Sequence, residues 1–151
     1  MKFKHIMMTL LFSLTVSGCQ NVNGILEFSL NDNNNSYSVT CRFDVDPISI
    51  EIPSTHLEKP VTSISEKAFY DCSALTTIVI SDTTTSIGDS AFFRCSSLTL
   101  IVIPLSVTSI GSAAFSGCSS LTIYAEASAK PSGWKDNWNS NYRPVVWGYT
   151  G

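Results

Sequence analysis

Hydrophobic residues recur at a constant spacing through the middle of the chain. Ile64, Ile87 and Ile110 lie 23 residues apart, and each opens the same pattern of apolar and polar positions. The positions that repeat with them are Ala68, Ala91 and Ala114; Phe69, Phe92 and Phe115; Cys72, Cys95 and Cys118; and Leu75, Leu98 and Leu121. A constant period of about 20 to 29 residues, with branched apolar residues at fixed offsets, predicts a solenoid of stacked coils.

Each coil contains two kinds of predicted element. Apolar residues alternate at Ile78 and Ile80 and at the equivalent places, which predicts parallel strands with these side chains inside. The Ala68-Phe69 segment and its equivalents predict short helical or 3-10 turns, where Ala permits close approach and Phe fills the interior. The predicted fold class is a leucine-rich repeat solenoid, an α/β repeat class rich in β-structure, with 23-residue coils and a parallel β-sheet.

The third repeat departs from strict spacing. A spacing of 23 residues would place Tyr124 and Glu126 at interior positions, and a buried Glu126 would be costly. Deleting one residue in this coil places Ile123 and Ala125 inside instead. We expect this slip, with Tyr124 and Glu126 facing outward.

Segments outside the clear repeats predict the two ends of the solenoid. Residues 25–30 and 37–43 alternate between apolar and polar positions around an Asn-rich stretch, so they predict a β-hairpin that covers the first coil. The next strand ends at Pro53, and residues 54–60 are predicted to be an inserted surface loop. The expected boundaries are residues 25–47 for the hairpin cap, 48–126 for the repeats and 127–151 for the C-terminal cap.

All three tryptophans lie in this C-terminal segment. One interpretation is a cap, because the last coil of a solenoid otherwise exposes its core to water. The alternative is a carbohydrate-binding platform formed by Trp134, Trp138 and Tyr142. The cap is favoured, since every solenoid needs one.

The first residues have the pattern of an export signal. Two lysines precede an apolar run that is too short to span a membrane, which takes about 20 apolar residues. The run ends at Val16-Ser17-Gly18-Cys19, which resembles the lipobox of bacterial lipoproteins. We expect residues 1–18 to be a lipoprotein signal peptide, Cys19 to carry the lipid and residues 19–24 to form a tether. An ordinary cleaved signal is the alternative.

Three of the other four cysteines belong to the repeats, and the fourth precedes them. Cys72, Cys95 and Cys118 share one position of the repeat, and we interpret them as buried thiols that pack as small hydrophobes. Cys41 lies in the hairpin segment. A disulfide between Cys41 and Cys72 stays open, because an exported protein folds in an oxidising compartment.

Composition and motifs argue against catalysis and against nucleic-acid binding. Charged residues make up 14% of the chain and the net charge is −3, so there is no basic patch for phosphates. After the signal the only histidine is His56, the cysteines lack the close spacing of a zinc site, and no nucleophile-elbow motif occurs. We expect no enzyme activity, no cofactor and no metal site.

The outward side chains of the predicted sheet are the favoured binding residues. They form a small stripe of β-branched, aliphatic and aromatic residues: Thr77, Val79, Leu100, Val102 and Tyr124. Contiguous exposed apolar surface often marks a partner site. The alternative is that these residues only reflect strand propensity.

The repeated unit V/T-T-S-I-x-x-x-A-F-x-x-C-S-x-L-T-x-I-x-I resembles the BspA-type leucine-rich repeat, over about residues 48–126. This resemblance implies a surface or secreted protein of bacteria or parasitic protists, acting in adhesion to a protein ligand on a host or neighbouring cell. With the lipobox, it implies an exported lipoprotein anchored at the bacterial cell surface through Cys19. The chain has fewer coils than such adhesins tend to carry.

Overall fold

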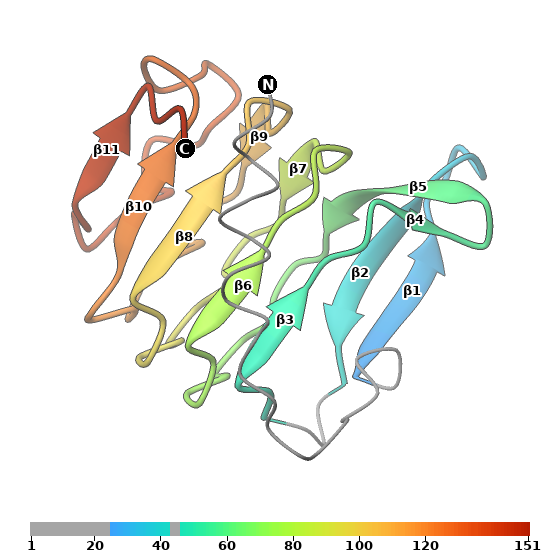
Figure 1. Cartoon of the computed structure of the whole chain (residues 1–151), viewed down its shortest axis with the longest axis horizontal. Coiled ribbons are helices and arrows are strands. Elements are labelled where there is room, and N and C mark those ends of the chain that lie inside the picture. Colours follow the sequence, from blue (N-terminus) through green and yellow to red (C-terminus); the bar gives the residue numbers. More distant parts are fainter. Residues whose placement is uncertain (1–24, 43–45) are drawn as a thin grey trace.

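The computed structural model describes residues 25–42 and 46–151, and this part of the chain is a solenoid of about five turns (Figure 1). The signal sequence and Cys19 lie outside the described residues. The strands are β1 (Leu26–Leu30), β2 (Tyr37–Cys41), β3 (Ser49–Glu51), β4 (Thr55–His56), β5 (Lys59–Ile64), β6 (Thr77–Val79), β7 (Ser86–Ile87), β8 (Leu100–Ile103), β9 (Ser109–Ile110), β10 (Thr122–Ala125) and β11 (Val145–Trp147).

Two sheets form the walls of the solenoid. The six-stranded sheet has the order β1-β2-β5-β7-β9, with β4 paired to β5, and the five-stranded sheet has the order β11-β10-β8-β6-β3. Successive turns pair in parallel and in register, so that Ile64 lies beside Ile87 and Ile87 beside Ile110. The predicted leucine-rich repeat solenoid with 23-residue coils is confirmed.

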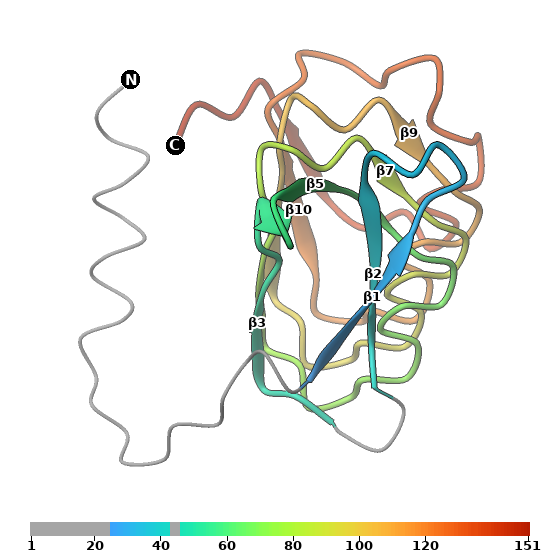
Figure 2. The ribbon, with the colours of Figure 1, turned by 90° about the vertical axis from the view of Figure 1, so that its right-hand side faces the viewer.

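The predicted helical turns are wrong, because the described residues contain no helix. The segment around Ala68-Phe69 makes isolated turns, with Tyr70 N–H donating to Lys67 O at 3.1 Å. Lys67 and Asp71 adopt left-handed φ angles of 54° and 61°, and the equivalent residues of the next repeats do the same. A left-handed residue every few positions ends each helical turn before a second can form. These turns close the stacked coils in the side view (Figure 2).

The interior is a set of stacked equivalent side chains. The rings of Phe69 and Phe92 are parallel within 2° with centroids 5.2 Å apart, and those of Phe92 and Phe115 are 5.5 Å apart. All three rings are fully buried. Ile123 and Ala125 are also fully buried, so the expected slip in the third repeat is present.

The hairpin supplies the first turn of the solenoid. β1 and β2 pair antiparallel, and β2 then pairs parallel with β5, so that β2 and β3 together form a turn beneath the first clear repeat. The insertion predicted as a surface loop is a small β-hairpin of β4 and the start of β5, turned by left-handed Leu57 and Glu58.

The C-terminal segment forms a fifth turn. Trp134 bridges in parallel to Ile110, and β11 pairs in parallel with β10. The ring of Trp138 packs edge-on against Phe115, at 5.9 Å between centroids. The Trp134 indole N–H donates to Val107 O at 3.1 Å. Trp134 and Trp138 are 2% and 5% exposed, so they close the end of the core.

We predict that Phe92→Ala lowers the free energy of unfolding by about 3–5 kcal/mol. The substitution leaves a cavity between the rings of Phe69 and Phe115, and the pairing of the turns keeps these two rings from moving together to fill it. Phe93→Ala is the matched control, because the neighbouring Phe93 lies partly exposed on the turn surface. Urea unfolding measures both variants. A loss below about 1 kcal/mol for Phe92→Ala would contradict the stacked core.

A second prediction concerns the close approach of successive coils at Gly88. A Cβ at this position would lie 2.4 Å from the backbone nitrogen of Glu66 in the preceding coil. Because backbone must move to relieve this contact, Gly88→Ala should destabilise the protein by about 1–3 kcal/mol. Ser65→Ala, at the equivalent position of the first repeat, should change stability by less. Equal thermal stability of the two variants would refute the argument.

Candidate binding face

The predicted binding residues lie together on the outer face of the five-stranded sheet. Thr77 pairs with Leu100, and the same register places Val79 beside Val102. Tyr124 pairs with Val102 on the next strand. Since these side chains alternate with the buried isoleucines, they all point away from the core.

Exposure differs among these side chains. Leu100 is 46% exposed and Thr77 is exposed, whereas Val79, Val102 and Tyr124 are half-buried among their neighbours. These side chains therefore form one continuous surface, and those in its middle are half-buried because they pack against side chains on the adjacent strands.

The structure extends this stripe beyond the predicted residues. Val146 of β11 pairs with Tyr124 and is 42% exposed. Tyr149, just after β11, packs edge-on against Tyr124 with ring centroids 5.0 Å apart. The sequence signal for this extra strand was the run Val145-Val146-Trp147. Side chains alternate along a strand, so Val146 points outward when its two neighbours point inward.

Charge is almost absent from the face. Among the residues of β3, β6, β8, β10 and β11, the only charged side chain is Glu51, on the first strand. Charged residues are depleted at the centre of protein–protein interfaces. We name the outward residues Val79, Leu100, Val102, Tyr124 and Val146 the apolar stripe.

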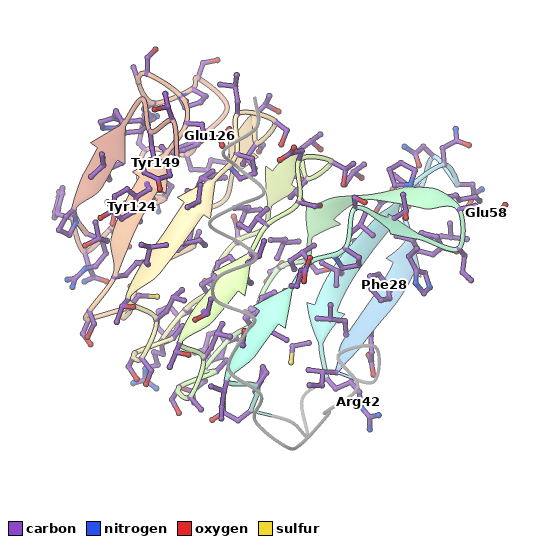
Figure 3. The ribbon with its side chains drawn as sticks, in the orientation of Figure 1. Phe28, Arg42, Glu58, Tyr124, Glu126 and Tyr149 are labelled. Carbon is purple, nitrogen blue, oxygen red and sulfur yellow. The ribbon has the colours of Figure 1, made fainter. Side chains whose placement is uncertain are left out.

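A more polar rim borders the apolar stripe at its C-terminal end. Figure 3 shows Tyr124 and Tyr149 close together, with Glu126 beyond them along the strand direction. A carboxylate oxygen of Glu126 accepts from the Leu105 N–H at 3.0 Å. Leu105 itself is 68% exposed, so apolar surface continues past the ends of the strands.

The six-stranded sheet presents a different surface. Its outward repeat positions are hydroxyls, with Ser86 paired to Ser63 on one side and to Ser109 on the other. The Thr85 hydroxyl donates to Thr62 O at 3.0 Å. This surface is polar and partly satisfied by the neighbouring coil, so the apolar stripe is a feature of one face.

The alternative carbohydrate platform is not favoured by the geometry. A sugar stacks on an exposed aromatic face, whereas Trp134 and Trp138 are buried in the fifth turn. Of the three residues proposed for that platform only Tyr142, at 91% exposure, offers an open ring.

Metal-binding groups do not converge in the described part of the chain. Residues 25–42 and 46–151 contain no group of three or more metal-ligating side chains. His56 stacks on Phe28 with ring centroids 4.0 Å apart and meets Tyr37 edge-on at 4.9 Å, so it packs as an aromatic ring. Within the same residues, no helix is long and apolar enough to cross a membrane.

The four described cysteines are all buried. The Cys95 thiol donates to Phe69 O at 3.1 Å and the Cys118 thiol to Phe92 O at 2.9 Å, which ties each thiol to the coil before it. The neighbouring Cys118 thiol and burial raise the pKa of Cys95. A thiol whose pKa is raised stays protonated, so Cys95 acts as a packing group.

Comparison with solved structures finds bacterial leucine-rich repeat proteins. A leucine-rich cell surface protein of Faecalibacterium prausnitzii is 28% identical with a TM-score of 0.61, over 82% of this chain and 41% of its own. A leucine-rich repeat protein of Treponema pallidum (TpLRR) is 24% identical with a TM-score of 0.53, over 83% of this chain and 63% of its own. One from Bacteroides capillosus is 22% identical with a TM-score of 0.51, over 68% of this chain and 94% of its own.

The chain therefore spans less than two thirds of the length of two of these three proteins. A comparison with curated proteins found no significant match. Among protein families, the BspA type leucine rich repeat region matches residues 48–127 in six copies. These residues hold the repeated isoleucine, phenylalanine and cysteine positions that build the core, and the chain belongs to the BspA-type leucine-rich repeat family.

Proposed function

We propose that this protein is a lipid-anchored bacterial surface protein that binds a protein ligand on a host or neighbouring cell through its apolar stripe. The observation that carries this proposal is the contiguous, nearly uncharged row of outward side chains across four adjacent strands. The family and the cell-surface relative from Faecalibacterium prausnitzii support the same location.

The physical case for binding rests on desolvation. Leu100 and Val146 expose more than two fifths of their surface, and the half-buried side chains between them join these into one patch. Each exposed apolar side chain gains about 1.5–3 kcal/mol when a partner buries it fully. Because the strands carry almost no charge, a partner can cover the stripe without stripping water from buried ions.

The anchor is inferred from the sequence. The apolar run and Val16-Ser17-Gly18-Cys19 support lipid attachment at Cys19, followed by a tether that leads to the solenoid. Several acyl chains on one cysteine would hold the protein at the membrane, since each buried CH₂ contributes about 0.8 kcal/mol.

The binding prediction uses the double variant Val79→Asp with Val102→Asp. Bacteria that express the full chain on their surface should adhere to cultured host cells or neighbouring bacteria at least about tenfold better than bacteria with this variant. Two adjacent carboxylates would have to lose water unpaired in the interface, and each tenfold corresponds to about 1.4 kcal/mol.

The matched control is Ser86→Asp with Ser109→Asp, which places two carboxylates side by side on the six-stranded sheet. Circular dichroism and surface labelling verify that both variants are folded and displayed. Adhesion that survives the stripe variant, or that is lost equally in the control, would refute the assignment of the face.

The anchor prediction is tested by metabolic labelling with a radioactive fatty acid. The wild-type chain should incorporate label and fractionate with membranes, and Cys19→Ser should do neither. Cys41→Ser, which removes a described thiol in the solenoid, should keep the label. Unlabelled wild-type protein, or label that persists in Cys19→Ser, would rule out lipidation at this residue.

A further inference from the structure

Cys41 occupies a special place in the first turn of the solenoid. The Phe69 N–H donates to Ala91 O in the following turn at 2.7 Å, and the Cys41 N–H donates to Ala68 O at 2.9 Å. Cys41 therefore takes, in the first turn, the place that Phe69 takes in the second. A thiol stands at the end of the ring stack instead of a fourth phenylalanine.

Cys72 lies in the turn directly above. In later turns the cysteine contacts the backbone of the phenylalanine in the preceding turn, as Cys95 does with Phe69. The same arrangement one turn lower places Cys72 against Cys41, and the two thiols lie within hydrogen-bonding range of each other.

The thiols of Cys95 and Cys118 also interact with each other, and the Cys41–Cys72 pair differs from them in the direction from which its side chains come. Cys95 and Cys118 occupy equivalent positions of the repeat, so their side chains leave the backbone in parallel. Cys41 and Cys72 come from different positions of the turn, so their side chains can approach from different directions. They are also 3% and 7% exposed, whereas Cys95 and Cys118 are completely buried.

We propose that Cys41 and Cys72 form a disulfide that joins the hairpin turn covalently to the first clear repeat when the protein folds outside the cytoplasm. The setting rests on the proposed export, and the chemistry does not. Cys41 ends β2 in the first turn and Cys72 lies in the second, so the bond would hold these two turns together.

The oxidant is a disulfide of the thiol–disulfide oxidoreductase or glutathione class. One thiol loses its proton and its sulfur attacks the oxidant, which releases one thiolate and leaves a mixed disulfide. The second sulfur then displaces the other half of the oxidant. One S–S bond forms, two protons leave, and two electrons pass to the oxidant, which ends as two thiols.

Burial also decides when the bond forms. The Cys41 thiol, burial and the carboxylates of Asp46 and Asp71 raise the pKa of Cys72. The thiolate is therefore scarce once the solenoid has closed, and attack on an oxidant is slow. Oxidation is expected while the first turn is still opening and closing during folding, and the finished bond is then shielded from reductants.

Peptide mapping of the full chain tests this proposal directly. The unfolded, reduced protein is refolded with oxidised and reduced glutathione, free thiols are alkylated, and trypsin is applied without reduction. Residues 68–94 form one tryptic peptide whose only cysteine is Cys72. We expect this peptide to be linked to the peptide that ends at Arg42, and fragmentation of the linked pair should place the bond at Cys41 and not at Cys19, which the same peptide contains.

Cys95 and Cys118 lie together in the peptide after Arg94, so they provide an internal control and should be alkylated. Peptide 68–94 recovered with an alkylated Cys72, or linked to the peptide after Arg94, would overturn the proposal. The same mapping on protein recovered from the bacterial surface then tests whether export supplies the oxidant, independently of the chemistry in vitro.

Thermal unfolding gives a second readout. Reductant should lower the Tm of the oxidised wild-type chain by about 5–10 °C, because the cross-link restricts the unfolded segment between the two cysteines. The Tm of Cys41→Ser should not respond to reductant. If that variant does not fold, the wild-type comparison alone decides, and an unchanged wild-type Tm contradicts a stabilising disulfide.

Discussion

Backbone hydrogen bonding between successive turns governs this molecule. The Phe92 N–H donates to Ala114 O at 2.8 Å, just as Phe69 donates to Ala91 at 2.7 Å one turn earlier. Buried backbone donors must find such partners, so each turn has to follow the path of the turn before it. Equivalent inward side chains then lie directly over one another, which explains why the sequence repeats isoleucine, alanine, phenylalanine and cysteine so closely.

Deviations are tolerated only where they leave this pairing intact. The extra residues between Pro53 and Val61 fold back as a small hairpin outside the wall. The slip in the third repeat keeps Ile123 in register with Ile101. The cost of burying Glu126 made that slip predictable from the sequence, because only one alignment keeps the carboxylate in water.

The turn segments were less predictable, because their conformation depends on left-handed φ angles that the residue types at these positions do not indicate. Left-handed φ angles recur at Lys67, Ser90 and Ala113, none of which is glycine. Inter-turn hydrogen bonds stabilise these angles. Local sequence alone favoured helical turns, and the tertiary ladder overrode that preference.

The sequence predicted only part of the apolar stripe. Strand alternation placed Val79 and Val102 outside, since their neighbours clearly belonged to the core. Val146 was missed because the tryptophans around it were interpreted as a separate cap. Trp138 lies 23 residues after Phe115, so the period itself contained the signal that a further turn was present.

The two ends of the stack of phenylalanine rings carry side chains of very different size. Trp138 closes one end with a larger ring packed edge-on against Phe115, and the Trp134 indole bonds to Val107 O beside it. At the other end Cys41 presents a small thiol where Trp138 presents a ring, and the register of β2 against β5 shifts between Tyr37 and Ser38, although Phe69 is still fully buried. Ring packing therefore constrains the first turn less than the last. A covalent bond to Cys72 would supply there the constraint that ring packing supplies at the other end.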